Sequence, residues 1–198
     1  VAKLATKDFA AFAVAAPGRI DRKQGIAVGS PNISWRNATL VADLERIFKS
    51  PGLIENDAKT AAVSEARLLE KKYSKVLYVT ISTGIGCGLI IDGLLDPRFH
   101  DIEIGNVLLE HHGKLQRWEE FASGKAIVKR FGKKASEITD QPTWRIISRN
   151  LALGLIDAIA TLTPDIIIIG GGVGSHFHKF DTLLVDYLNK YDNPVITI

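Results

Sequence analysis

Apolar and polar residues recur with two distinct periods along this chain. A helical period, with apolar residues three or four positions apart, predicts helices over 38–48, 58–69, 119–131, 143–162 and 181–190. Short continuous apolar runs predict strands over 10–16, 53–54, 76–81, 89–91 and 166–169. The last run contains only isoleucine, which is typical of a parallel strand buried on both faces. Strands that alternate with helices, without a long linker, predict an α/β fold.

The remaining segments are interpreted from their turn and breaker residues. We expect residues 1–9 to be the end of a helix, 19–30 a loop or hairpin, 31–35 a loop anchored by Trp35, and 195–198 a strand. The polar stretch 71–75 separates an alanine-rich helical pattern from the next apolar run. We therefore place a boundary there, between a part formed by residues 1–72 and a part formed by residues 73–198.

Composition excludes several classes of protein. The chain has 198 residues and a net charge of +3, and its basic residues are spread along the sequence, so a nucleic-acid partner is not expected. The single cysteine, Cys87, excludes a disulfide within the chain and a zinc site built from several of its own cysteines. A membrane-length apolar run and a signal peptide are both missing from the pattern, which predicts a cytoplasmic protein without membrane contact. The chain begins at Val1 and contains no methionine, so we expect it to be part of a longer protein.

The glycine-rich stretch 79–94 is the strongest local signal for chemistry. Two apolar runs flank Ser82-Thr83-Gly84-Ile85-Gly86-Cys87-Gly88, which predicts a hairpin with a glycine-rich turn. Gly84, Gly86 and Gly88 allow positive φ and leave backbone N–H groups open to a phosphate, to which Thr83 adds a hydroxyl donor. The alternative is a hairpin whose turn simply requires glycine.

Three further residues allow both a structural and a functional interpretation. Asn56 and Asp57 precede the predicted helix 58–69 and suit its N-terminal cap, as Thr143 suits the cap of the helix 143–162. Glu119 begins another predicted helix, where a capping or solvent-facing role is the ordinary one. The residues alone leave these alternatives open.

Five separated signatures, the first of which has two parts, resemble in their order the ROK family of sugar kinases and sugar-responsive repressors. They are PGRID at 17–21 followed by PNISW at 31–35, ENDAKTAAVSE at 55–65, TISTGIGCGLIIDGLL at 80–95, WEEFASG at 118–124 and PDIIIIGGGV at 164–173. The resemblance extends over essentially the whole chain. It implies the actin-like, ribonuclease H-like ATPase fold, in which two α/β lobes surround a cleft.

The resemblance also implies a reaction and its residues. The family transfers the γ-phosphoryl group of ATP, with Mg²⁺, to the 6-hydroxyl of a hexose or related sugar. Asp57 matches the general base, a role that suits a carboxylate at a helix N-terminus. The other matches to sugar-binding positions are Asn56, Glu103, Asn106 and Glu119. The matches to nucleotide-binding positions are Thr83, Gly84 and Gly86 in the second phosphate loop and Gly171 and Gly172 beneath the adenosine.

Family members are commonly homodimers, so the resemblance implies a homodimer as well. Some members use polyphosphate rather than ATP as the phosphoryl donor. The sugar itself is not indicated by any of the matching segments.

The chain departs from the family pattern in three places. Asn106 stands where the family has a histidine that contacts the sugar and, in many members, ligates zinc together with three cysteines. Those cysteines are absent between Gly105 and Glu119, so structural zinc is not expected, and the nearby His111 and His112 either replace the histidine or are exposed loop residues. The family's D-x-G-G-T phosphate loop, which holds phosphates and Mg²⁺, is not found in this sequence.

Two functions outside catalysis compete with the kinase. A sugar-sensing repressor of the same family binds sugar without phosphoryl transfer, and a non-catalytic sugar-binding protein fits the departure at Asn106. Asp57 and the glycine-rich stretch favour the kinase, because a sensor has no chemical need for either.

Overall fold

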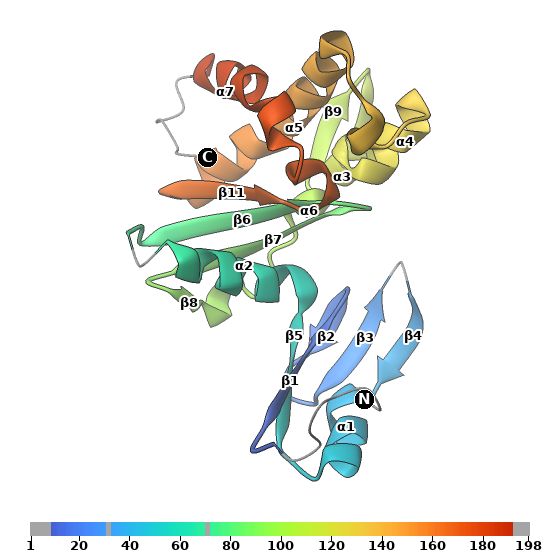
Figure 1. Cartoon of the computed structure of the whole chain (residues 1–198), viewed down its shortest axis with the longest axis vertical. Helices are drawn as coiled ribbons and strands as arrows, with labels where there is room; N and C mark the ends of the chain where they lie inside the picture. Colours follow the sequence, from blue (N-terminus) through green and yellow to red (C-terminus); the bar gives the residue numbers. More distant parts are fainter. Residues whose placement is uncertain (1–8, 31–32, 70–71, 192–198) are drawn as a thin grey trace. The chain divides into compact units, whose positions relative to one another are not determined.

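The computed structural model describes residues 9–30, 33–69 and 72–191, which form two compact units, 1–60 and 61–198. Residues 1–8 of the helix end expected over 1–9, and the strand expected over 195–198, lie outside the described residues, and Phe9 is not helical. Each unit is described by itself below, and Figure 1 gives the labels of the elements. The division falls after Thr60, whereas the sequence pattern placed it near residue 72. The assignment of the two units to lobes stays a prediction.

The smaller unit combines two sheets and one helix. Strand β1 (Phe12–Ala16) pairs in parallel with β5 (Gly52–Asn56). Strands β2 (Arg19–Asp21), β3 (Ile26–Ser30) and β4 (Ile33–Ala38) form an antiparallel sheet in that order. Helix α1 (Leu40–Phe48) adds Val41 to a core that also contains Ala16, Ile20, Ala27 and Ile54. The segment 19–30 is therefore a hairpin rather than an irregular loop.

The predicted loop at 31–35 is wrong where the structure describes it. Residues 33–38 form strand β4, and the side chain of Trp35 is exposed (42%) instead of anchoring a loop. An edge strand pairs on one side only and has little to bury. Its polar residues therefore conceal the period of two that identifies a half-buried strand.

The larger unit is built on a four-stranded sheet in the order β11-β6-β7-β8. Strands β6 (Lys75–Ile81) and β7 (Ile85–Ile91) form the predicted hairpin, and β8 (Leu94–Leu95) continues it in antiparallel pairing. Strand β11 (Ile166–Gly170) pairs with β6 in parallel, as the isoleucine run predicts. Figure 1 shows these strands as one layer.

Helices cover both faces of this sheet (Figure 1). On one face, Ala62 and Ala66 of α2 (Asp57–Leu68) pack against Val76, Tyr78 and Ile90. On the other face lies the larger core, to which α5 (Gln141–Leu162) and α7 (Asp181–Asn189) contribute. The alternation of side chains along β6 separates the two cores, because successive residues point to opposite faces.

Shorter elements fill the chain between β8 and α7. They are η1 (Pro97–Phe99), η2 (Ile104–Asn106), β9 (Leu108–His111), β10 (Lys114–Arg117), α3 (Trp118–Ala122), α4 (Gly124–Phe131), η3 (Ala135–Glu137), α6 (Gly171–Gly174) and η4 (Phe177–Lys179). Strands β9 and β10 pair antiparallel as a separate two-stranded sheet.

Two predicted helix boundaries are corrected by local capping. The single helix expected over 119–131 is interrupted at Ser123, which is extended (ψ 166°) and whose Oγ accepts from the Ala126 N–H at 3.3 Å. Ser123 therefore caps a second helix. The helix expected from Thr143 begins at Gln141, and its cap is Asp140, whose Oδ1 accepts from the Thr143 N–H at 2.9 Å.

Within the described part of the chain, every helix is too short or too polar to cross a membrane.

Candidate functional site

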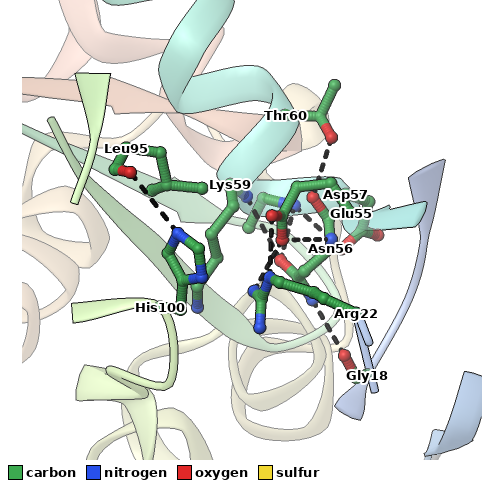
Figure 2. A network of polar contacts seen from close by, with 10 residues as sticks. Gly18, Arg22, Glu55, Asn56, Asp57, Lys59, Thr60, Leu95 and His100 are labelled. Carbon is green, nitrogen blue, oxygen red and sulfur yellow. Dashed lines mark hydrogen bonds and ion pairs between the residues drawn. The ribbon is translucent and has the colours of Figure 1, made fainter. Parts of the chain in front are cut away.

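The end of β5 and the start of α2 bring together the candidate residues of the smaller unit. Asn56 is buried (7% exposed), and its Oδ1 accepts from the N–H groups of Ala58 at 3.0 Å and Lys59 at 3.2 Å. Asn56 is thus the predicted N-terminal cap of α2. Its Nδ2 donates to the Gly18 carbonyl at 3.0 Å, which ties the turn at 17–18 to this point (Figure 2). An amide nitrogen has two hydrogens, and this bond uses one of them.

Asp57 is the first residue of α2, and its side chain is exposed. Its Oδ1 accepts from the Ala58 N–H at 2.9 Å, so the carboxylate lies at the helix N-terminus. The partial positive charge of a helix N-terminus attracts a negatively charged side chain. Position and exposure therefore suit a base that a substrate hydroxyl must reach.

A half-buried ion pair supports the same strand end. Arg22 donates to both carboxylate oxygens of Glu55, with Nε–Oε2 at 2.8 Å and Nη2–Oε1 at 2.6 Å (Figure 2). Glu55 Oε1 also accepts from the Asn56 N–H at 2.6 Å. A two-pronged Arg–carboxylate contact fixes orientation as well as distance. The sequence pattern did not single out either residue, because nothing in its spacing marks a pair that is 33 positions apart.

In the larger unit, residues 82–84 form the turn between β6 and β7, closed by the Ser82 N–H donating to the Gly84 carbonyl at 2.9 Å. Thr83 is exposed in this turn. Gly84, Gly86 and Gly88 do not use the positive φ that glycine allows. Gly86 and Gly88 lie within β7, in extended backbone that any residue adopts.

Gly84 lies directly beside the carboxylate of Glu119. A Cβ on Gly84 would lie 2.6 Å from the Oε2 of Glu119. The same oxygen accepts from the Ile85 N–H at 3.3 Å. The carboxylate predicted to bind sugar is therefore in contact with the turn predicted to bind phosphate.

The other residues of the larger unit that are predicted to bind sugar lie close to the start of strand β7. Glu103 and Asn106, both exposed, lie at the two ends of η2, where the Asn106 N–H donates to the Glu103 carbonyl at 3.0 Å. Between them, a Cβ on Gly105 would lie 2.2 Å from the carbonyl oxygen of Ile85. Ile85 thus contacts η2 through its carbonyl and Glu119 through its N–H.

The two glycines predicted to lie beneath the adenosine differ in whether the fold itself requires glycine. Gly171 has φ +82°, and a Cβ there would lie 2.6 Å from the Ile81 carbonyl oxygen, so the fold itself needs glycine. Gly172 is exposed, and a Cβ there would meet no atom within 4 Å. The Gly124 N–H donates to the Ser82 carbonyl at 2.7 Å, so the start of α4 lies against the hairpin turn.

The two adjacent histidines differ from each other. His111 ends β9, and its ring stacks on Phe121 with centroids 4.1 Å apart, while Nε2 lies 3.3 Å from the Asn150 Oδ1. The expectation of an exposed loop residue is wrong for His111 and correct for His112. Burial lowers the pKa of His111.

The candidate residues fall into two groups, one in each unit. Asn56 and Asp57 belong to the smaller unit, and the others belong to the larger one. A single cleft that combines both groups stays a prediction. Among the residues that the structure describes, no group of three or more His, Cys, Asp or Glu side chains is arranged to hold a metal ion.

Comparison with known proteins gives sugar kinases and a repressor as relatives. A fructokinase from Lactococcus lactis subsp. cremoris is 29% identical over 183 residues, which are 86% of this chain and 62% of the fructokinase. A xylose repressor from Bacillus subtilis (strain 168) is 28% identical, over 81% of this chain and 47% of the repressor. The chain thus spans less than two thirds of the length of these relatives.

A solved structure of a ROK family protein is also similar to this chain. The crystal structure of a ROK family glucokinase from Streptomyces griseus in complex with glucose and AMPPNP is 27% identical. It superimposes with a TM-score of 0.71 over 89% of this chain and 68% of the glucokinase. The α/β fold is therefore the actin-like ATPase fold of ROK structures. The sequence model of the ROK family matches residues 2–194, and this chain belongs to the ROK family.

Proposed function

We propose that the protein containing this chain is an ATP-dependent sugar kinase that phosphorylates the 6-hydroxyl of a hexose or related sugar. The observation that carries this proposal is the contact of Glu119 with the 82–85 turn. It brings a carboxylate suited to sugar hydroxyls against a turn suited to phosphate. The fructokinase relative and the glucokinase crystallised with glucose and AMPPNP support both halves of the reaction.

Sugar binding falls to side chains that accept hydrogen bonds from hydroxyl groups. Glu119 and Glu103 are carboxylates, and hydrogen bonds to a charged acceptor are roughly twice as strong as those between neutral groups. Asn56 and Asn106 both donate and accept. Because Asn56 is also the cap of α2, its orientation is set before any sugar binds.

Asp57 is the base of the proposed reaction. Its carboxylate takes the proton of the 6-hydroxyl as that oxygen forms a bond to the γ-phosphorus, and the bond from this phosphorus to the bridging oxygen of ADP breaks. The proton ends on Asp57 and the electron pair of the broken bond on ADP. Most of the catalysis is positioning of the two reactants.

The nucleotide rests on backbone and small residues. The exposed Thr83 offers its hydroxyl to a phosphate, and the space above Gly172 leaves room for the adenosine. ATP supplies the phosphoryl group, and Mg²⁺ would offset the charge of its phosphates. We assign no Mg²⁺ ligand to the described residues.

The decisive experiment is a coupled assay of the full-length protein with Mg-ATP against a panel of hexoses and N-acetylhexosamines. We expect turnover with at least one sugar. Asp57→Ala and the isosteric Asp57→Asn should lower kcat roughly 100-fold or more, since a general base contributes about that much. Sugar affinity, measured by calorimetry, should stay within about threefold of the wild type, because the base acts on the reacting proton.

Two further variants test whether the loss of activity is specific to Asp57. Asp157→Asn removes a carboxylate from the exposed side of α5 and should leave kcat unchanged. Glu119→Ala should weaken sugar binding. Near-full activity of the Asp57 variants would show that the base is misassigned.

The second candidate function is a sugar-responsive repressor, which the xylose repressor relative favours. Absence of turnover, with one sugar of the panel still raising Tm, would support this repressor, or a non-catalytic sugar-binding protein, over the kinase.

A further inference from the structure

The Glu119 carboxylate lies directly on the turn that the proposed function gives to phosphate. Its Oε2 accepts from the Ile85 N–H at 3.3 Å. The same oxygen lies 2.6 Å from the point at which any other residue at position 84 would place its Cβ.

A carboxylate and a phosphate compete for such a turn. Both are anions, and both accept hydrogen bonds from backbone N–H groups. Two like charges within a few ångströms of each other repel, and the repulsion strengthens where protein replaces water. A nucleotide phosphate at the turn is therefore disfavoured while Glu119 remains there.

A sugar offers Glu119 a different set of donors. Its hydroxyl groups compete with the long Ile85 contact for the same carboxylate, and a Glu side chain has three rotatable bonds with which to turn toward them. Moving the carboxylate onto the sugar leaves the Ile85 N–H to a phosphate oxygen.

We propose that Glu119 couples the two substrates: without sugar it occupies the phosphate-binding turn, and sugar binding draws it away and raises the affinity for nucleotide. This inference rests on the proposed function, since it uses the same sugar and phosphate sites. Coupling between two ligands is reciprocal, so nucleotide must raise the affinity for sugar by the same factor. The arrangement also limits wasteful ATP hydrolysis when no sugar is present.

The test measures nucleotide binding without any sugar, so that loss of sugar affinity cannot confuse it. The dissociation constant of AMPPNP is determined by calorimetry for the full-length wild type, Glu119→Gln, Glu119→Ala and Glu120→Gln. We expect roughly five- to twentyfold tighter binding by both Glu119 variants, within the usual range of coupling between sites. Glu119→Ala should be at least as effective, because it also vacates the Ile85 N–H.

Glu120→Gln is the matched control. Glu120 lies on the same helix and carries the same charge, but its Oε2 accepts from the Arg117 N–H at 3.0 Å instead of contacting the turn. Its removal should leave AMPPNP affinity within about twofold of the wild type. Equal tightening by Glu120→Gln, or no tightening by the Glu119 variants, would overturn the coupling.

Gly84→Ala offers a second way to displace the Glu119 carboxylate from the turn. Its methyl group would meet Glu119 Oε2 at 2.6 Å, and this atom is the far end of a flexible side chain that can move aside. The factor by which sugar raises AMPPNP affinity should therefore fall toward one in this variant. Retention of the full wild-type factor would contradict the proposal.

The outcomes separate this inference from the proposed function. Turnover by the wild type, together with unchanged AMPPNP affinity in the Glu119 variants, would refute the coupling alone. Absence of both turnover and AMPPNP binding in every variant would refute the kinase and the coupling together.

Discussion

At the scale of single residues, the surroundings of His111 disfavour protonation of its imidazole ring. Its ring stacks on Phe121, and burial is the main reason that its pKa lies below the usual 6.5. The positive charges of Arg130 and Arg149, and the neighbouring His112, act in the same direction, while the bond to Asn150 acts against them. The folded protein therefore favours the neutral imidazole.

This shift predicts how stability depends on pH. The unfolded chain takes up a proton at about 6.5 and the folded chain only below that, so the free energy of unfolding falls as pH decreases from about 6.5 to the native pKa. Lowered carboxyl pKa values, such as that of Asp96 at about 2, act only in more acidic solution. We expect His111→Gln to lose part of the decrease in Tm between pH 7.5 and 5, measured by thermal unfolding.

His112→Gln is the matched control for this measurement. The side chain is adjacent and exposed, so its replacement should leave the decrease in Tm as it is in the wild type. An identical pH profile for His111→Gln and the wild type would show that the burial of His111 does not affect its protonation.

Residues of the site were predictable to different degrees. Asn56 and Asp57 precede a clear helical pattern, so their place at a helix start followed from the sequence. The glycines of the hairpin were recognised, but the contact of Gly84 with Glu119 was not. Glu119 lies 35 positions later in the sequence, and no local pattern records such a contact.

At the scale of elements, the contact between α5 and α3 holds Glu119 in place. The indole of Trp118, fully buried, lies against Gly154 of α5, and its Nε1 donates to the Asn150 carbonyl at 3.0 Å. The Asn150 Nδ2 donates in turn to the Phe121 carbonyl at 3.2 Å. The longest helix of the described chain thus positions the short helix that carries Glu119.

Gly154→Ala tests this contact. In an exposed helix, the change from glycine to alanine stabilises by about 1 kcal/mol. Here a Cβ would lie 2.1 Å from the Trp118 ring, and crowding a packed core typically costs about 1–3 kcal/mol. We expect a net loss of stability in chemical denaturation and weaker sugar binding as α3 shifts.

The exposed position Asp157 supplies the comparison on the same helix. Asp157→Ala should change the free energy of unfolding by less than about 0.5 kcal/mol. Greater stability of Gly154→Ala than of the wild type would mean that α3 yields to the added methyl group at no cost.

Elements that bury one or both faces were predictable from their period. Helix α5 follows from its helical period and strand β11 from its continuous apolar run, because burial in the core imposes the apolar pattern that the sequence displays. The break between α3 and α4 was missed because Ser123 both ends one helix and caps the next, and the apolar spacing continues across it. Strand β4 was missed because it is polar along most of its length.

At the scale of the whole molecule, the three tryptophans report on different units. Trp118 and Trp144 are buried in the core of the larger unit, with exposed fractions of 0% and 1%. Trp35 lies on the edge strand of the smaller unit and is 42% exposed. An aqueous quencher therefore distinguishes the units without any label.

Iodide should quench the emission of Trp35 and leave the emission of the two buried indoles nearly unaffected, because an anion does not enter a packed apolar core. We expect Trp35→Phe to remove most of the quenchable fraction. The midpoint of unfolding followed by tryptophan emission should stay nearly the same, because Trp35 is exposed and its replacement removes little packing. Quenching that persists in Trp35→Phe would show that Trp118 or Trp144 is open to solvent, and the packing that holds Glu119 on the hairpin turn would then be wrong.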